Sequence, residues 1–256
     1  MSIETIILGL IQGLLEWWPV SSTSVLIIVS KYFGLNLEES FLLAMILHLP
    51  TGLAAIYLFR KSFLKILSEV FRLELSKYTR SYILSLIVSI TTGFPIYLLY
   101  RDLIRGYSLI ALTIIGIGLI VTTIVFFIKP SRKYREEISL KDWLVTGLIQ
   151  GLSVIPGFSR SGLTIGYLCI RGYKPFKAVE TSILLAIPIL IAAGLYNIFE
   201  LQYDLTKIFT ASVLVFTTAM LSGKLLVNIA LKSRIYIFTL LLAILIFTNI
   251  ILEIFL

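Results

Sequence analysis

The sequence predicts an all-α integral membrane protein with six transmembrane helices and two re-entrant helical hairpins, arranged as inverted-topology repeats. Composition gives the first observation: 58% of the 256 residues are hydrophobic and only 14% are charged, far from the balance of a soluble domain. The second observation is a set of apolar stretches long enough to span a membrane. The third is an internal sequence repeat.

Six apolar stretches are long enough to cross the roughly 30 Å of a bilayer's hydrocarbon core, which takes about 20 helical residues. They are 40–60, 81–100, 107–128, 179–199, 208–228 and 236–255. Because none of them borders a separate polar region, we expect 1–256 to form a single membrane domain. The first Lys or Arg is Lys31, so the N-terminus lacks the basic region of a signal peptide and should be retained.

Four further apolar pieces are too short to span a membrane, and each pair is interrupted by Pro, Ser and Gly. They are 3–16 and 24–35 near the N-terminus, and 143–155 and 163–171 in the middle of the chain. Non-helical backbone at membrane depth is tolerated only inside protein or beside a wet cavity. We therefore predict two re-entrant hairpins whose breaks face inward.

An internal repeat relates the two hairpins. The segment GLIQGL occurs at 9–14 and again at 147–152, an offset of 147 − 9 = 138, and Pro50 and Pro188 lie at the same offset inside apolar helices. The chain is therefore predicted to consist of two repeats, approximately 1–128 and 139–256.

Loop charges predict the orientation. A re-entrant hairpin adds no net crossing, so three spans per repeat place the second repeat upside down relative to the first. Sixteen Lys and Arg residues then lie on one side of the membrane, in the segments 60–80, 129–142, 171–178 and 229–235. Four lie on the other side: Lys31, Arg101, Arg105 and Lys207. The positive-inside rule makes the first side cytoplasmic, which predicts a multi-pass plasma-membrane protein with both termini outside.

The formal charge of +8 follows from these loops, and we expect no nucleic-acid partner. The basic stretch 60–80 has apolar residues at helical spacing, which is consistent with an amphipathic helix at the membrane surface, but a solvated cytoplasmic loop is the preferred interpretation.

Glu16 is the acidic residue of the first hairpin, at a depth where ionising a carboxyl group is costly without partners. Gln12 lies four residues earlier, on the same face of a helix that must end before Pro19. We expect a functional role for Glu16, with interfacial exposure as the alternative.

Arg160 is the one Lys or Arg in either hairpin break, in the segment 156–164. Its guanidinium offers planar, paired donors that match phosphate oxygens, and small neighbours let backbone N–H groups approach an anion at the start of a helix. The predicted phosphate-binding residues here are Gly157, Ser159, Arg160, Ser161 and Thr164. The alternative is a salt bridge, for example to Glu16, that only pins the hairpins together.

A run of hydroxyl side chains, 21–24, follows Pro19 where the second limb of the first hairpin begins. One of them should be a helix N-cap. A hydroxyl beside a carboxylate can also act as a nucleophile or hold a water that does. We therefore predict that Ser21 and Thr23, together with Gln12, contact the substrate.

The segments QGLLEWWPVSST at 12–23 and PGFSRSGLT at 156–164 resemble the two signature motifs of the undecaprenyl-diphosphate phosphatase family, also called BacA or UppP. The resemblance covers the whole chain. It implies removal of the terminal phosphate from a polyprenyl diphosphate carrier lipid, at a mid-membrane site open to the outer face, for recycling of the carrier. It also implies help from a divalent cation, Mg²⁺ or Ca²⁺.

Matched to the family motifs, Glu16 corresponds to the second acid, Ser22 to the serine proposed as nucleophile, and Arg160 with its neighbours to the phosphate cradle. Two positions depart from the pattern. Gln12 stands where the first acid is expected, and Val25 where the family has a histidine. Because Mg²⁺ and Ca²⁺ prefer charged oxygen ligands, these losses weaken any metal site made of side chains alone, and no metal ligand is assigned.

The single histidine and the single cysteine exclude two other kinds of site. A type 2 phosphatidic acid phosphatase would need a pair of histidines, whereas His48 is alone. It lies in the span 40–60, and we interpret it as a packed side chain, with a pocket-lining role as the alternative. Cys169 excludes an intrachain disulfide and should simply pack.

The main alternative function is a transporter or flippase of polyprenyl phosphate or another anionic lipid, because inverted repeats with broken helices are also transporter architecture. Fold alone cannot separate the two functions. The expected partners are the membrane and a polyprenyl diphosphate lipid, and the sequence leaves a homodimer open.

Overall fold

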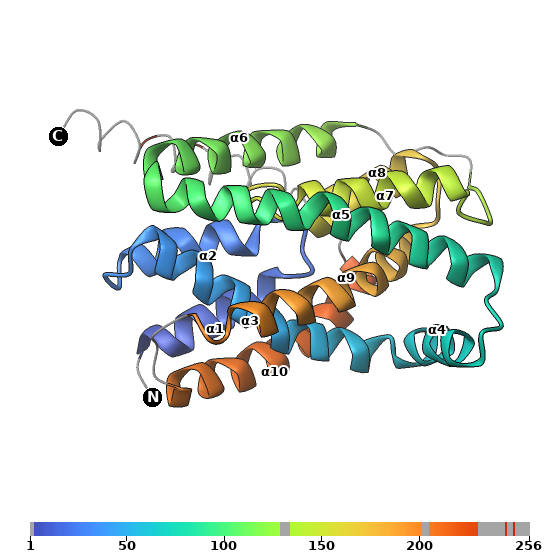
Figure 1. The fold of residues 1–256 in the computed structure, drawn as a ribbon, viewed down its shortest axis with the longest axis horizontal. Helices are drawn as coiled ribbons and strands as arrows, with labels where there is room; N and C mark the ends of the chain where they lie inside the picture. Colours follow the sequence, from blue (N-terminus) through green and yellow to red (C-terminus); the bar gives the residue numbers. More distant parts are fainter. Residues whose placement is uncertain (1–2, 129–133, 201–204, 230–243, 245–247, 249–256) are drawn as a thin grey trace.

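The computed structural model describes residues 3–128, 134–200, 205–229, 244 and 248, and within these the regular structure is ten helices (Figure 1). The helices are α1 (Ile3–Leu15), α2 (Ser22–Lys31), α3 (Leu37–Leu58), α4 (Arg60–Arg72), α5 (Lys77–Gly106), α6 (Ser108–Phe127), α7 (Leu140–Leu152), α8 (Arg160–Ile170), α9 (Pro175–Asn197) and α10 (Leu205–Ile229). The all-α prediction is confirmed at this level.

Several helices begin three or four residues before the predicted spans because their first turns are polar and capped. Asn36 and Glu39 form a capping box at the start of α3, and the Ser76 and Ser139 side chains accept backbone N–H groups at the starts of α5 and α7. Hydropathy alone cannot locate such starts, since the capped turn contains few apolar residues.

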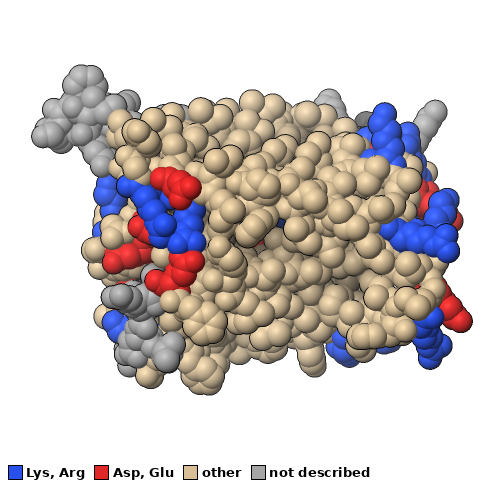
Figure 2. Space-filling view, viewed as in Figure 1, with Lys and Arg blue, Asp and Glu red and all other residues tan. Residues whose placement is uncertain are grey.

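Five of the described helices, α3, α5, α6, α9 and α10, are long and apolar enough to cross a membrane. They correspond to the first five predicted spans. The sixth, 236–255, falls outside the described residues except at Ile244 and Thr248. Large apolar side chains such as Leu99 on α5 and Ile124 on α6 point outward, and a broad belt without charge separates two charged ends in Figure 2. Such a belt is the surface of a multi-pass membrane protein.

The helix contacts pair the short helices with long ones. α1 packs on α10, α7 packs on α5, and α3 packs on α9 between them. The α1–α2 pair lies toward the end of the molecule that holds the N-terminus, whereas α7 and α8 extend toward the opposite end, where α4 lies (Figure 1). Both breaks, between α1 and α2 and between α7 and α8, meet in the interior.

The stretch 60–80 is not a loop throughout: most of it forms the amphipathic helix α4, which is shorter than the stretch itself. Ile66 is buried, while Leu64 and Phe71 are exposed beside the basic residues. The helix ends at Leu73, which has the left-handed φ of 59° that terminates a helix.

Asp142 holds the outer ends of α7 and α8 together. Its side chain is fully buried, and it accepts hydrogen bonds from Arg171 Nε (2.7 Å), Tyr167 Oη (2.7 Å), Tyr173 Oη (2.6 Å) and Ser139 Oγ (2.8 Å). Burial raises the pKa of this carboxyl group, but the hydrogen bonds, first that from Arg171, outweigh burial and hold the pKa well below its usual range.

Replacing this carboxylate should destabilise the protein. Asp142→Asn keeps the shape but removes the charge opposite Arg171 and points an amide donor at other donors, so we expect the free energy of unfolding to fall by about 3 kcal/mol. The thermal unfolding midpoint of detergent-solubilised protein measures this loss. Asp102→Asn, at an exposed position of α5, is the matched control; equal midpoints for the two variants would contradict the assignment.

Candidate active site

Glu16 is positioned by the end of α1. Its backbone N–H still bonds to the Gln12 carbonyl (3.1 Å), after which the chain turns through Pro19 into α2. The buried Trp17 fixes this turn, because its indole N–H donates to the Ala219 carbonyl of α10 (2.9 Å). Glu16 and Gln12 therefore lie one helical turn apart and face the same way, as predicted.

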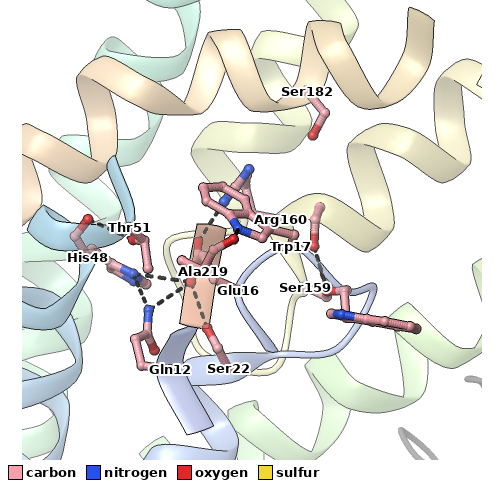
Figure 3. A network of polar contacts seen from close by, with 12 residues as sticks. Gln12, Glu16, Trp17, Ser22, His48, Thr51, Ser159, Arg160, Ser182 and Ala219 are labelled. Carbon is pink, nitrogen blue, oxygen red and sulfur yellow. Dashed lines mark hydrogen bonds and ion pairs between the residues drawn. The ribbon is translucent and has the colours of Figure 1, made fainter. Parts of the chain in front are cut away.

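Glu16 is the centre of a polar network (Figure 3). Arg160 Nη2 donates to its Oε1 (2.6 Å), and Ser22 Oγ (2.8 Å) and Gln12 Nε2 (2.8 Å) donate to its Oε2. His48 of α3 brings Nδ1 to 3.3 Å from the same oxygen. Glu16 is 6% exposed, so the predicted interfacial alternative is wrong. The three predicted catalytic residues Glu16, Ser22 and Arg160 lie in one cluster.

His48 Nδ1 lies between the Gln12 amide and the Glu16 carboxylate. With Gln12 Oε1 turned toward Glu16, two acceptors would oppose each other, so Nε2 is assigned to this side. Gln12 Nε2 lies 2.8 Å from His48 Nδ1, and Glu16 Oε2 lies 3.3 Å from the same nitrogen.

Arg160 is the first residue of α8, and the preceding loop sets its position. Gly157 has φ +97°, and a Cβ there would lie 2.2 Å from the Ile115 carbonyl oxygen, so only glycine fits. The guanidinium lies 5.8 Å from the Trp17 ring. Its Nη1 is buried and, within the part of the chain that the structure describes, has no hydrogen-bond acceptor. The predicted Arg160–Glu16 salt bridge is thus present, and it leaves donors of Arg160 unused.

The two hairpin breaks are tied directly to each other. The Gly157 N–H donates to Ser21 Oγ (2.9 Å), and Ser161 Oγ donates to the Trp18 carbonyl (2.7 Å). Ser21 is also the N-cap of α2, accepting from the Ser24 N–H, which confirms that one hydroxyl of this run is a cap. These ties bring the Glu16 side and the Arg160 side into one site.

The remaining predicted substrate-binding residues differ in how accessible they are. Thr23 and Ser159 line the cavity beside Arg160, and Ser159 is in addition the N-cap of α8, accepting from the Gly162 N–H (3.1 Å). Thr164 is fully buried behind the loop; its hydroxyl donates to the Arg160 carbonyl and contacts Ser182 Oγ. Gln12 is likewise fully buried behind Glu16.

Two residues at the site were not selected from the sequence. His48 lines the cavity, which confirms the pocket-lining alternative, and its side chain is also mostly buried, with Nδ1 2.8 Å from Gln12 Nε2. Thr122 of α6 accepts from the Ser159 N–H (3.0 Å) and donates to the Gly157 carbonyl (2.9 Å), which holds the loop before Arg160. A lone histidine beside a proline in an apolar helix was a usable signal for His48. Thr122 is a hydroxyl residue within an apolar span, and no sequence signal identified it as part of the site.

The network opens into a cavity of about 300 Å³ whose wall is mostly apolar. Glu16, Ser22, His48 and Arg160 lie along one part of it, and much of the rest is lined by α5, α9, the end of α7 and the loop that follows α7. The arrangement can bind an anion at Arg160 and accept a proton at Glu16, next to a hydroxyl group.

The chain is similar to proteins of one family. A family model described as bacitracin resistance protein BacA matches residues 5–247. A Bacteroides fragilis protein named undecaprenyl-diphosphatase is 31% identical over 247 residues, covering 92% of either chain. Proteins with the same name from Methanothrix thermoacetophila and Saccharolobus solfataricus are 34% identical over 194 and 200 residues, covering 75% and 73% of this chain and 73% and 70% of theirs.

Proposed function

Because this chain belongs to the BacA family, we infer that it is an undecaprenyl-diphosphate phosphatase, a membrane hydrolase that removes the terminal phosphate of a polyprenyl diphosphate carrier lipid. The relatives do not favour the transporter alternative, since their name describes a hydrolase. Hydrolysis of this bond requires an anion-binding group, a nucleophile and a proton acceptor close together.

The observation that carries the proposal is the Arg160 Nη1 group, which has no acceptor among the residues that the structure describes, beside the Ser22–Glu16 hydrogen bond. A guanidinium that uses only Nη2 on Glu16 still offers donors to a phosphate oxygen. The terminal phosphate would dock there, with its phosphorus facing Ser22 Oγ. Arg160 also stabilises the ionised form of Glu16, which a proton acceptor needs.

In the proposed reaction Glu16 Oε2 takes a proton as the attacking oxygen bonds to the terminal phosphorus. That oxygen belongs to Ser22 or to a water that Ser22 holds. The bond from phosphorus to the bridging oxygen breaks, and polyprenyl phosphate leaves. If Ser22 attacks, a water then hydrolyses the phosphoserine. Ser22→Ala separates attack by Ser22 from attack by water, because it abolishes turnover only if Ser22 itself is the nucleophile.

We propose that His48 positions the Glu16 carboxylate through Nδ1, which lies 3.3 Å from Oε2. A hydrogen-bonded contact to a charged group is worth about 1.5–3 kcal/mol, so His48→Ala should lower kcat by about ten- to 100-fold. Phosphate release by purified protein measures the effect. Tyr57→Ala, at an exposed position of the same helix outside the cavity, is the control; wild-type kcat in His48→Ala would remove His48 from the mechanism.

A divalent cation held by side chains alone does not fit these residues. Among the described residues no three His, Cys, Asp or Glu side chains gather. The site offers the Glu16 carboxylate, which already faces Arg160, and the His48 imidazole, whereas Mg²⁺ and Ca²⁺ take about six oxygen ligands or more. We therefore propose that Mg²⁺ or Ca²⁺ would arrive on oxygens of the diphosphate.

We further propose that α1–α2 and α7–α8 are re-entrant hairpins of two inverted repeats, with the site at mid-membrane. The paired contacts of α1 with α10 and of α7 with α5, and the entry of the hairpins from opposite ends, support this arrangement. Loop charges favour both termini outside. A homodimer remains a proposal that size-exclusion chromatography with light scattering would test.

The function is tested by phosphate release from undecaprenyl diphosphate by purified protein in detergent, with Mg²⁺ or Ca²⁺, compared with Glu16→Ala and Arg160→Ala. We expect release by the wild type and its loss in both variants. Absence of release under every cation condition, together with movement of a polyprenyl phosphate across vesicles containing the protein, would overturn the phosphatase and favour the transporter.

A further inference from the structure

Helix α4 lies across one charged end of the molecule. α3 ends at Leu58, and the chain turns at Phe59 (φ −109°, ψ 26°) directly into α4. Figure 1 shows α4 strongly foreshortened, close to a view along its own axis, whereas α3, α5 and α9 run lengthwise across the picture. Because these three long helices are apolar enough to cross the membrane, the axis of α4 lies close to the plane of the membrane surface.

One face of α4 is fixed against the rest of the protein. Ile66 is buried, and Phe63 packs against the same hydrophobic core. Ser62 Oγ donates to Glu180 Oε1 of α9 (2.6 Å). These contacts set the rotation of the helix about its axis, so the faces that point away from the bundle have fixed directions.

One outward face of α4 is an apolar stripe, formed by Leu64, Leu67 and Phe71. Leu64 and Phe71 are seven residues apart, about two helical turns, and Leu67 lies between them on the same face. Leu64 is 59% exposed and Phe71 is 83% exposed, so none of the described residues covers the stripe. Large apolar side chains in this position are unfavourable in water and favourable in lipid.

The neighbouring outward face is a basic stripe, formed by Lys61, Lys65 and Arg72. All three side chains are exposed, and their spacings of four and seven residues place them on one face of the helix. Lys65 follows Leu64 directly, so the basic stripe is about 100° around the helix from the apolar one. Glu69, the one acid of α4, accepts a hydrogen bond from the Ser76 N–H (3.0 Å). Lys and Arg also predominate at this end of the molecule in Figure 2.

We propose that α4 is a docking surface for anionic phospholipids of the adjoining membrane leaflet. The apolar stripe lies among the first carbons of the acyl chains, and the basic stripe lies at the level of the lipid phosphates. A helix in the plane of the interface has three neighbours, namely the protein, the acyl chains and the headgroups, and the three faces of α4 match them in chemistry. The proposal is independent of the proposed function, because no residue of α4 lines the cavity.

The test measures the depth of α4 with a fluorescent probe. Ser68 is exposed between the two stripes, and Ser68→Cys with Cys169→Ala gives one labelling site, because Cys169 is the single cysteine. The protein is placed in nanodiscs of phosphatidylcholine, with or without phosphatidylglycerol, that contain a lipid with a nitroxide near the headgroup end of its acyl chain. We expect quenching to be at least about twofold stronger with phosphatidylglycerol. A probe at Glu137→Cys, an exposed position in the segment before α7, should be quenched little in either disc.

Removing charge tests whether the basic stripe recognises the lipid. Replacing its three residues by glutamine should abolish the difference between the two lipid compositions. The matched control removes three exposed charges from the same end of the molecule outside α4, by Lys77→Gln, Arg80→Gln and Lys141→Gln, and should keep the difference. Equal quenching of the Ser68→Cys probe in both kinds of disc would overturn the recognition of anionic headgroups. A probe that lipid does not quench but aqueous iodide does would show that α4 faces water, and would overturn the docking surface.

Discussion

Arg160→Lys should lower kcat/KM for undecaprenyl diphosphate by about 10³-fold, the lower end of what a transition-state arginine contributes to phosphoryl transfer. Lysine keeps the charge but is a point charge. It loses the planar fork that holds Glu16 through Nη2 and that, in the proposed function, would hold a phosphate oxygen through Nη1 at the same time. Phosphate release at saturating and limiting substrate measures the loss.

This substitution also separates the two interpretations of Arg160. If the residue only pinned the hairpins through its salt bridge, a lysine would preserve that bridge and activity would stay near the wild-type value. The control is Arg105→Lys, because the Arg105 guanidinium pairs with Glu38 near the C-terminal end of α5 and does not line the cavity. Turnover in Arg160→Lys equal to that in Arg105→Lys would refute a phosphate-binding role.

The sequence correctly predicted the parts of the fold that depend on local sequence patterns. Long apolar runs predicted five spans, and Pro19 and the Pro156 segment predicted the breaks, because a proline and a run of small polar residues interrupt a helix wherever it lies. Helix starts were missed by three or four residues where a capped polar turn, as at Asn36, precedes the apolar run.

The site could be predicted only where its residues belong to the two breaks. Glu16, Ser22 and Arg160 lie beside breaks, so the meeting of the hairpins brings them together. His48 and Thr122 come from α3 and α6, and which face of an apolar helix meets the hairpins depends on packing rather than on local pattern. The same packing decides that Thr164 turns away from the cavity.

The two helix breaks begin their second helices in the same way but carry different chemistry. Ser21 and Ser159 are 159 − 21 = 138 residues apart, and each is the N-cap of its hairpin's second helix. The next position holds Ser22 in one hairpin and Arg160 in the other. The same scaffold therefore presents a hydroxyl from one side and a guanidinium from the other, and Glu16 connects them by accepting a hydrogen bond from each.

Glu16→Gln should lower kcat by about 10³- to 10⁴-fold, the upper range for loss of a proton acceptor. The amide keeps the size of the side chain and can accept a hydrogen bond, but it cannot take a proton from Ser22 or a water. Phosphate release under single-turnover conditions measures the chemical step and keeps product release out of the result.

Stability must be followed in the same experiment, because removing one partner of a buried ion pair costs about 3–5 kcal/mol. Glu16→Gln leaves the Arg160 charge without its partner, so a lower unfolding midpoint is expected, and activity should be compared at a temperature where both proteins are folded. Glu16→Asp keeps the charge and restores much of the stability, yet it withdraws the carboxylate from Ser22 by one methylene. An aspartate variant that is stable but slow would assign the loss to proton transfer, whereas a folded glutamine variant with wild-type kcat would show that another group accepts the proton.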